Sequence, residues 1–343
     1  MDISLISHVF NESYLLPFWI KHHRQMFDSA TIIDYSSTDE TIAILKKYAP
    51  STWNVVRSVN SQFEASACDL EVMEIEKSIE GWKIALTATE FLIFPEMQNV
   101  LDNLEARSKN AVRISGYAMV DPADLGDQVI NPNEPLWSEF HYGVPEYELC
   151  HRYPPSETSR PMGRLLHANA TGQYLVGRHA WRQDDGELPR SVASILWYGF
   201  SPWTPNLVGR KAQIRNRIPA GDLLAGRGTH HHERIDQIEE TRQKYLELSY
   251  DLNSLLEFRQ VTGAYDSSSK TLEPELHMNS LPFGHKFGPL DLAQYVNSHF
   301  GIESESENKA WEYLAHLKAL EQSNEQINRG LSMEKLRRLL WRK

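Results

Sequence analysis

The sequence predicts an open α/β fold in which helices flank a mainly parallel sheet, with a mostly helical region towards the C-terminus. Strand-like apolar runs alternate with helix-like periodic segments through the first third of the chain. Such alternation is typical of right-handed crossovers between parallel strands. From about residue 233 helical patterns dominate, interrupted by loops with glycine and proline near 263–290. We therefore expect an α/β domain over residues 1–235 and a mostly helical region over residues 236–343.

The expected elements follow one another closely along the first third of the chain. Strands are predicted at 3–10, 30–34, 54–59 and 82–86, and helices at 14–26, 40–48 and 66–80. Residues 121–163 are rich in Pro, Asp, Glu and aromatic residues and have weak periodicity, which predicts a long excursion or lid over the sheet.

Composition excludes several classes of protein. With 35 basic and 46 acidic residues, the net charge of -11 disfavours a general nucleic-acid binder, because the phosphate backbone is also negative. The only two cysteines, Cys68 and Cys150, cannot form a disulfide framework or a cysteine zinc site, which favours a reducing compartment. The chain has no basic leader and no apolar run of about 18 residues, so we expect a cytoplasmic protein without a membrane span.

The last ten residues, 334–343, combine leucines and Trp341 with five basic side chains. This composition is compatible with a solvated amphipathic helix, and equally with a peripheral contact to an anionic membrane or partner.

Polar side chains follow the predicted strands, at the edge where an open parallel sheet binds its ligands. The residues that follow the first, second and fourth strands are Asn11 and Glu12, Asp34 and Asp39, and Glu90. Carboxylates and amides placed there could bind a base and ribose hydroxyls, while helix N-termini favour a diphosphate. A purely structural interpretation is also open, because Ser37 and Glu40 fit a capping box for the following helix.

Taken together, these segments resemble the family 2-like glycosyltransferases with the GT-A fold. The resemblance lies in residues 10–16, 19–23 and 32–39, in their order and spacing. Residues 82–92 resemble the segment in which that family usually has the motif Asp-x-Asp-Glu-Phe. Residues 177–179 and 226–231 resemble its Gly-x-His and Gly-x-Gly-x-x-His elements. The resemblance covers about residues 1–235 and implies a GT-A-like sheet.

The resemblance also implies an activity. A nucleotide-diphospho-sugar would lie over the first half of the sheet, and its sugar would pass to an acceptor hydroxyl, with inversion and in polysaccharide or surface-glycan assembly. The donor-binding residues that it implies are Asn11, Glu12, Asp34 and Asp39, with Arg57 and Asp69 as further candidates.

The metal motif departs from the family pattern. Thr87 and Thr89 replace both aspartates and leave Glu90 as its only carboxylate. Mg²⁺ or Mn²⁺ would suit a leaving diphosphate, and the cation would then need Glu90 together with His230 and His231. Two alternatives stay open: metal-independent donor binding, or loss of activity. Glu90 could also be a surface acid at a strand end, and residues 230–232 a solvated loop.

A catalytic base is expected from Glu90 or from Asp185, which follows the Gly-x-His element. The segment around Asp185 equally fits a polar Asp-Gly turn, and His179 could orient an acceptor or satisfy a buried network. Residues 195–203 are apolar, which fits a segment of the hydrophobic core. They are also rich in aromatic residues, which fits a surface that stacks on sugar rings. A basic run could meet the diphosphate or form a solvated face; its members are Arg210, Lys211, Arg215 and Arg217.

Three other classes remain. An inactive nucleotide-sugar or glycan-binding protein would explain the missing aspartates. A Rossmann-type oxidoreductase would share the alternation, but no Gly-x-Gly-x-x-Gly loop follows the first strand. A scaffold built on the C-terminal helices is the third.

Overall fold

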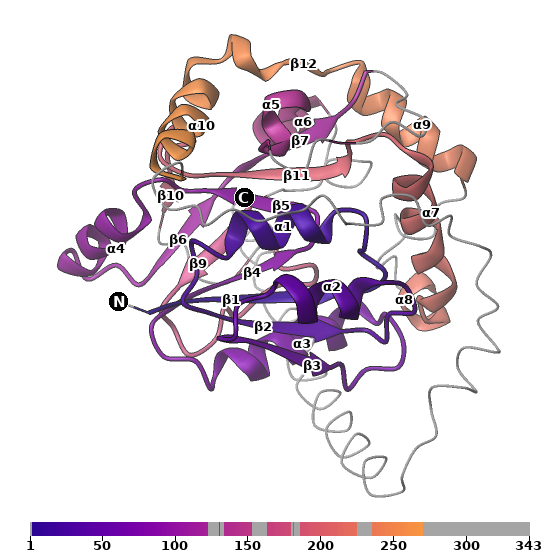
Figure 1. Ribbon diagram of the computed structural model, residues 1–343, viewed down its shortest axis with the longest axis horizontal. Helices are drawn as coiled ribbons and strands as arrows, with labels where there is room; N and C mark the ends of the chain where they lie inside the picture. The colour runs from indigo at the N-terminus through magenta and orange to yellow at the C-terminus, as the bar shows by residue number, and fades with distance from the viewer. Residues whose placement is uncertain are drawn as a thin grey trace, which may run out of the picture.

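The protein folds into two β-sheets with helices packed around them (Figure 1). The computed structural model describes residues 2–122, 130, 134–152, 163–179, 181, 186–224 and 235–269. The first sheet, sheet A, has seven strands in the order β10-β6-β9-β4-β1-β2-β3, and the second, sheet B, has five in the order β12-β8-β7-β11-β5.

Sheet A is mainly parallel, as predicted. Strands β1 (Ile3–Val9), β2 (Ser29–Asp34), β3 (Trp53–Arg57) and β4 (Trp82–Thr87) run in one direction. Strand β9 (Arg164–His167) is antiparallel to both β4 and β6 (Ala111–Ile114), and β10 (Glu187–Leu188) is parallel to β6. The expected α/β class, an open and mainly parallel sheet flanked by helices, is therefore confirmed.

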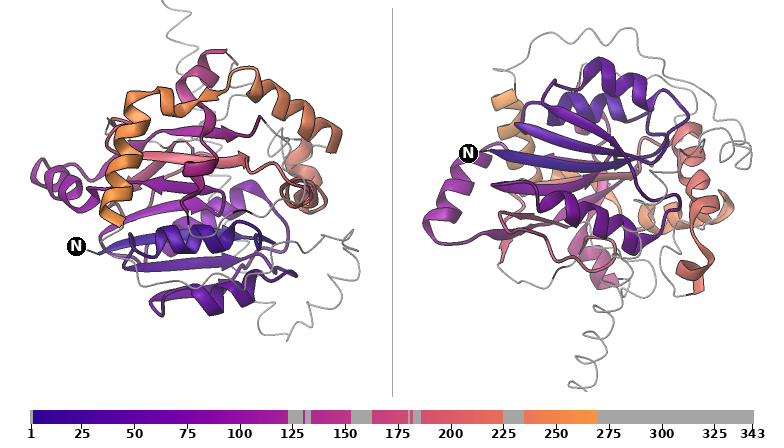
Figure 2. Two further views of the ribbon diagram at one scale, coloured as in Figure 1. Left: turned by 45° about the horizontal axis from the view of Figure 1, so that its top comes forward. Right: turned by 90° about the horizontal axis from the view of Figure 1, so that it is seen from below.

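Alternating side chains of sheet A fill two separate cores. Leu5 and Ile32 pack with helices α1 (Leu16–His23) and α2 (Thr41–Tyr48), whereas Ile6 and Ile33 pack with Val72 of α3 (Ala65–Glu76). This period of two is the ordinary consequence of the pleat. Both faces of the sheet are thus covered, with α3 opposite α1 and α2 (Figure 2), which explains why β1 and β4 bury nearly every side chain.

Sheet B is assembled from segments that lie far apart in the sequence. It contains β5 (Glu90–Ile93), β7 (Gly116–Val120), β8 (Tyr142–Pro145), β11 (Ser194–Phe200) and β12 (Tyr250–Asp251). Residues 195–200 are accordingly a central strand of this sheet. Glu90 opens β5, two residues after β4 ends, so it begins a new strand instead of a loop.

The predicted excursion over residues 121–163 is wrong for its described part. Residues 136–152 form α5 (Leu136–Glu139), β8 and α6 (Glu146–Arg152), and β8 pairs with β7 inside sheet B. Each of these elements has seven residues or fewer, which is too short to give a clear period in the sequence.

The described helices after residue 235 share the main core. Tyr245 of α9 (Ile235–Leu246), and Phe258 and Val261 of α10 (Leu256–Ser269), belong to the same buried cluster as Trp19 and Trp82. A short 3₁₀ turn, η3 (Leu252–Ser254), follows β12. No separate core marks the predicted boundary at 235 within the described residues, and residues 270–343 lie outside them.

The remaining described helices lie at the two ends of sheet A. Helix α4 (Met97–Ala106) lies at one end, while α7 (Pro205–Gln213) and α8 (Ala220–Leu224) lie beside the carboxyl ends of β1 and β2, joined by the 3₁₀ turn η1 (Ile214–Arg217) (Figure 1). Among the described helices, none is both long and apolar enough to cross a membrane.

Candidate functional site

The strand order of sheet A marks one edge as the place for a ligand. The chain runs outward from β1 through β2 to β3 and then returns to the other side of β1 with β4. In open α/β sheets a ligand binds beyond the carboxyl ends of the strands, at the point where the order reverses. That point lies between β1 and β4, and the residues that follow these strands are 10–15 and 88–89.

Asn11 holds the loop after β1 against the loop after β2. Its Oδ1 accepts the Thr38 backbone N–H at 2.7 Å, and its amide donates to Oε1 of Gln213 in α7 at 2.8 Å. The backbone of Asn11 is left-handed, with φ of 52°, a conformation that asparagine tolerates better than most residues. The carboxyl end of β1 therefore turns sharply and points a fully buried amide at its neighbours.

Two aspartates complete this arrangement through backbone donors. Asp34 accepts the Ser37 N–H at 3.0 Å, while Asp39 accepts the N–H groups of Ser13 at 3.1 Å and Thr41 at 2.9 Å. We call Asn11, Glu12, Asp34 and Asp39 the loop network. The capping-box interpretation is wrong, because α2 begins at Thr41 and the Ser37 hydroxyl instead accepts the Asn11 N–H at 3.0 Å.

Glu12 is bonded to a residue almost two hundred positions away. Nε of Arg210 in α7 donates to both Glu12 oxygens, at 2.9 and 3.0 Å, and the Glu12 side chain is only 4% exposed. Such a fork is the strong, directional form of an arginine–carboxylate pair. Glu12 therefore fixes α7 over the loop after β1.

Another arginine of the basic run also lies at this edge. Arg217 donates to the Tyr35 carbonyl at 2.7 Å and its guanidinium stacks on the Phe10 ring, 4.1 Å from the centroid. Asp222 of α8 accepts the Ala65 N–H, at the start of α3, at 2.7 Å. Residues 205–224 thus contact the chain that follows β1, β2 and β3, and the edge is framed by residues from both halves of the molecule.

A second group of charges follows β4. Arg164 of β9 donates from Nε to both Glu90 oxygens, at 3.0 and 2.9 Å, and from Nη2 to Oε1 at 2.6 Å. The Thr87 N–H adds a bond to Oε2 at 2.8 Å. The side chains of Arg164 and Glu90 are 4% and 2% exposed, so this is a buried ion pair.

The Gly-x-His element joins this pair to another one. Arg164 Nη1 donates to the Gly177 carbonyl at 2.8 Å, and the Gly177 N–H donates to Asp69 of α3 at 2.7 Å. Arg178 Nη1 donates to the other Asp69 oxygen at 2.6 Å. We call Glu90, Arg164, Asp69 and Arg178 the paired-arginine cluster, which holds two carboxylates and two guanidinium groups.

The turn that carries Arg178 is unusual. Gly177 and Arg178 both have left-handed backbones, with φ of 95° and 59°, and only glycine adopts this region freely. Nε of Arg178 is buried and has no hydrogen-bond partner among the described residues. Left-handed backbone in a residue other than glycine, next to a buried donor without a partner, is typical of functional sites.

His8 lies at the end of β1, opposite Thr87 in the pairing with β4. Burial lowers the pKa of its imidazole; Glu71, 3.7 Å away, opposes the shift and the Arg178 charge adds to it. His8 is therefore neutral at pH 7, and its contact with Glu71 places α3 beside the end of the β1–β4 pair.

Several predicted site residues are brought together. Asn11, Glu12, Asp34 and Asp39 share one group of loops, and Arg57 is exposed at the end of β3, in register with Asp34. Glu90 and Asp69 lie in the second cluster. Asp185, His230 and His231 lie outside the described residues, so the base at Asp185 and a cation held by both histidines stay predictions.

Sequence reasoning missed the residues that bind the predicted carboxylates. Arg164 and Gln213 carried no signal, and Arg178 was visible only as the middle residue of the Gly-x-His element. Arg210 and Arg217 were noticed as part of a basic run, but their partners could not be assigned.

Glu90 does not fit the role of a metal ligand in this geometry. Three of its four hydrogen bonds come from Arg164 and one comes from Thr87, so both oxygens are occupied. The hydroxyls of Thr87 and Thr89 lie 3.0 Å apart and bond each other. Within the described part of the chain, no three His, Cys, Asp or Glu residues are grouped to hold a metal ion.

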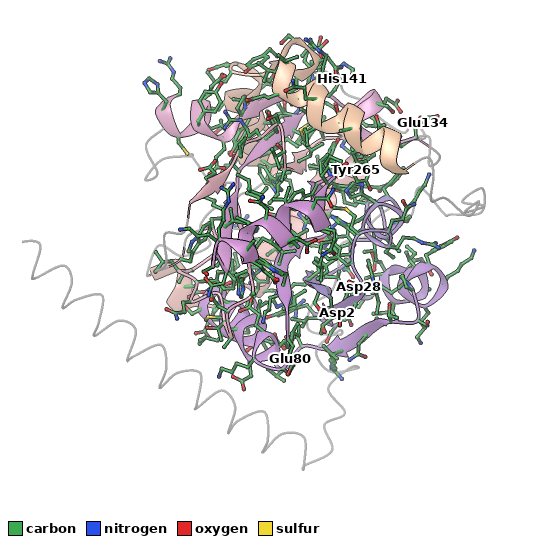
Figure 3. The ribbon with its side chains drawn as sticks, turned by 90° about the vertical axis from the view of Figure 1, so that its left-hand side faces the viewer. Asp2, Asp28, Glu80, Glu134, His141 and Tyr265 are labelled. Atoms are coloured by element: carbon green, nitrogen blue, oxygen red, sulfur yellow. The ribbon has the colours of Figure 1, made fainter. Side chains whose placement is uncertain are left out.

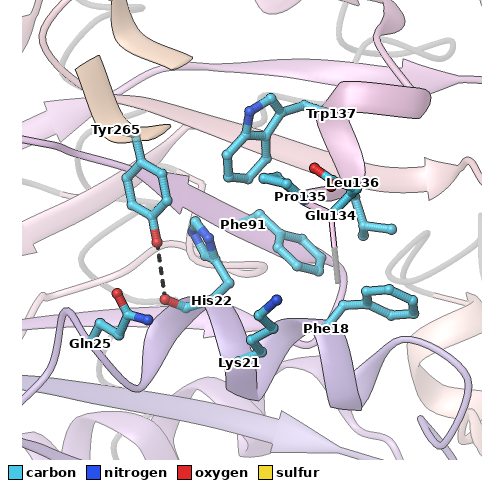
Figure 4. A pocket seen from close by; sticks show the side chains of 10 residues that line it. All are labelled: Phe18, Lys21, His22, Gln25, Phe91, Glu134, Pro135, Leu136, Trp137 and Tyr265. Atoms are coloured by element: carbon cyan, nitrogen blue, oxygen red, sulfur yellow. Dashed lines mark hydrogen bonds between the residues drawn. The ribbon is translucent and has the colours of Figure 1, made fainter. Parts of the chain in front are cut away.

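An aromatic cavity of about 60 Å³ lies elsewhere, between α1, β5, α5 and α10 (Figure 4). Two of its polar side chains are engaged: Tyr265 donates to the His22 carbonyl at 3.1 Å, and the His22 ring bonds the Leu92 carbonyl at 2.6 Å. Burial lowers the pKa of His22 to about 4, so its ring is neutral. None of the predicted site residues lines this cavity.

The amino edge of sheet A, opposite the candidate site, carries exposed acidic residues (Figure 3). Asp2, Asp28 and Glu80 lie there, and Asp28 accepts the Ile3 N–H at 2.9 Å. All three are exposed, and this edge provides control positions for the experiments below.

Comparison with known proteins gives distant structural likenesses. No family model matches the sequence, and no curated protein matches it. The chain is similar to a solved structure of S. aureus TarS 1-349 in complex with UDP-GlcNAc, with 16% identity and a TM-score of 0.28, covering 38% of this chain and 37% of that one. A second structure of S. aureus TarS 1-349 gives 10% identity and a TM-score of 0.32, over 78% of this chain and 81% of that one.

Glucosyl-3-phosphoglycerate synthase from Mycobacterium tuberculosis, in complex with phosphoglyceric acid, gives 12% identity and a TM-score of 0.30, over 71% of this chain and 80% of that one. Likenesses of this size carry no conclusion about activity, so the function has to be argued from the site itself.

Proposed function

We propose that this protein is a glycosyltransferase that binds a nucleotide-diphospho-sugar at the carboxyl edge of sheet A and passes the sugar to an acceptor hydroxyl. The observation that carries the proposal is the position of the loop network, which joins the carboxyl ends of β1 and β2 beside the point between β1 and β4 where the strand order reverses. The segments that resemble family 2-like glycosyltransferases, residues 10–16 and 32–39, fall at this edge. That resemblance also favours hexosyl transfer with inversion, in polysaccharide or surface-glycan assembly.

Asp34 is the best-placed residue for the nucleoside. Its side chain is half-buried, and among the described residues only Ser37 bonds its carboxylate, through Oδ1. Oδ2 is therefore available to a ribose hydroxyl or a base N–H. Glu12 differs, because Arg210 occupies both of its oxygens, and we assign it to holding α7.

Asp185 is the base of this proposal. Transfer to a hydroxyl needs a carboxylate that takes the acceptor's proton, and Asp185 follows the Gly-x-His element whose Gly177 and Arg178 lie beside Glu90 and Asp69. Both cysteines are free thiols, which fits the cytoplasmic location that we propose. A peripheral contact through residues 334–343 remains part of the proposal.

Calorimetric titration with UDP, GDP and CDP, and with their sugar conjugates, tests the proposal. At least one nucleotide should bind, and Asp34→Ala should weaken it by about 1.5–3 kcal/mol, because a hydrogen bond to a charged group is lost. The matched control is Glu80→Gln, an exposed acid at the amino edge (Figure 3), which should leave the dissociation constant unchanged. Failure of every nucleotide to bind the folded protein would refute the proposal.

A second candidate is a nucleotide-sugar or glycan-binding protein without activity. The engagement of Glu90 by Arg164 favours it, since a carboxylate with both oxygens bonded to a guanidinium is a poor base. Transfer or hydrolysis of the bound donor, measured on wild type and on Asp185→Asn, separates the two. Turnover lost in the variant supports the enzyme, whereas binding without turnover in either supports the inactive protein.

A further inference from the structure

We infer that the paired-arginine cluster replaces a divalent cation at this edge: Arg178 donates to the donor diphosphate from its Nε–H, which has no partner among the described residues, and Glu90 is a positioning residue that fixes Arg164. The inference rests on the proposed function, because it names the group that binds the anionic part of the donor.

The first step concerns Glu90. A carboxylate has about four lone-pair directions, and here four hydrogen bonds reach it from Arg164 and Thr87. A cation could bind only by displacing Arg164, which is 4% exposed and would then be a buried charge without a partner. Removing one partner of a buried pair leaves an uncompensated buried charge, so displacement is unfavourable.

The second step concerns the neighbouring hydroxyls. The Oγ atoms of Thr87 and Thr89 bond each other at 3.0 Å, and neither carries a charge. Mg²⁺ and Mn²⁺ favour carboxylate oxygens, so these two side chains do not replace the aspartates at a metal site.

The third step concerns Arg178. Its guanidinium donates from Nη1 to Asp69. Its Nε is buried and has no hydrogen-bond partner among the described residues. An unsatisfied buried donor is destabilising, and an incoming acceptor oxygen would remove that penalty. Arginine donors make strong, directional bonds to phosphate oxygens.

The fourth step concerns position. Arg178 is bonded to Asp69 of α3, and Glu71 of the same helix lies 3.7 Å from His8, whose partner across the strands is Thr87 at the end of β4. Asp69 lies in the second turn of α3, on the same face of the sheet. The Arg178 side chain thus lies near the crevice between β1 and β4, which is where the strand order predicts a ligand. Arg164 contributes indirectly, by bonding the Gly177 carbonyl and so fixing the turn.

The test measures binding of UDP, GDP and CDP to the full chain by calorimetry, in excess EDTA and in excess MnCl₂. The dissociation constant should agree within about twofold between the two conditions, and Arg178→Gln should raise it about tenfold or more. Since that variant leaves Asp69 unpaired, the double variant Asp69→Asn/Arg178→Gln removes both charges and should show the same loss. The control Arg107→Gln, an exposed arginine after α4, should bind like wild type.

The outcomes separate the two proposals. Nucleotide binding that requires Mn²⁺, or that is unchanged in folded Arg178 variants, would overturn this inference and leave the function standing. Absence of binding with and without Mn²⁺ would overturn the function and the inference with it. Titration of MnCl₂ alone, followed by electron paramagnetic resonance, should give no stoichiometric site; a site that Glu90→Gln removes would make Glu90 a metal ligand and refute its positioning role.

Discussion

The two aspartates of the loop network and the two carboxylates of the paired-arginine cluster lie at the same edge of sheet A, yet they are held in different ways. Asp34 and Asp39 accept backbone N–H groups of nearby loops and remain partly exposed. Glu90 and Asp69 accept from arginines and are buried. Among the described residues, the first arrangement leaves Oδ2 of Asp34 available to a ligand, whereas the second uses both carboxylates fully and offers an arginine donor instead. A carboxylate placed after a strand is therefore a ligand only where its lone pairs are free.

Removing the Glu90 charge should have the largest effect. Glu90→Gln leaves Arg164 buried without a counter-charge, and the free energy of unfolding should fall by about 3–5 kcal/mol. The double variant Glu90→Gln/Arg164→Met should recover most of that loss, because no charge is left buried. Chemical denaturation followed by circular dichroism measures all three proteins.

The exposed pair between Lys77 and Glu74, with side chains 47% and 42% exposed, is the matched control. Lys77→Met should cost less than about 1 kcal/mol, as exposed pairs do. A cost for Glu90→Gln as small as that of the control would mean that the two clusters do not differ in the way described.

The two clusters also differ in how far the sequence predicts them. The strands and helices of the first 90 residues were predicted to within a few residues, since each is apolar or periodic and crossovers are short. The contacts between the two loops of the network follow from this, because they join residues only 26 to 29 positions apart. The contacts of Asn11 and Glu12 with α7 do not follow from it, because they span about 200 positions. Neighbouring parallel strands end at the same edge of a sheet, so the residues that follow them lie close together.

The paired-arginine cluster could not be predicted in the same way. Glu90 lies 74 positions from Arg164, and Asp69 lies 109 from Arg178. Arg164 reaches Glu90 because β9 pairs with β4 in the antiparallel direction. This pairing cannot be predicted from the sequence, because β9 has only four residues. Sheet B was missed for the same reason, since its strands come from five distant segments.

Asp121 allows the two ways of holding a carboxylate to be compared further, because it is buried, as Glu90 and Asp69 are, but accepts a hydrogen bond from a backbone N–H group, as Asp34 and Asp39 do. It accepts the Trp203 N–H at 2.7 Å, but burial raises its pKa to about 6, and that bond and the Arg242 charge oppose the shift only in part. A raised pKa means that its contribution to stability is present below about pH 3.8 and is lost as the pH rises through 6. The loss is about 3 kcal/mol, from about 1.4 kcal/mol per pKa unit.

Asp121→Asn should abolish this dependence, since the amide oxygen still accepts from Trp203 and carries no charge. The difference in unfolding free energy between variant and wild type should therefore shift in favour of the variant between pH 4 and pH 7. A difference that stays constant over this range would show that the carboxylate is ionised throughout.

Asp39 should give the smallest effect and the one most specific to the loop network. Its two oxygens accept from Thr41, at the start of α2, and from Ser13, in the loop after β1. Asp39→Ala should cost about 0.5–2 kcal/mol, the range for loss of a helix-capping oxygen, and should weaken nucleotide binding because the two loops separate. Asp39→Asn keeps an oxygen for one of the two donors and should lie between Ala and wild type. Glu40→Ala is the control, because that exposed neighbour makes no capping bond. If Glu40→Ala were as costly as Asp39→Ala, the start of α2 would depend on charge near the helix end and not on the Asp39 hydrogen bonds that hold the loop network together.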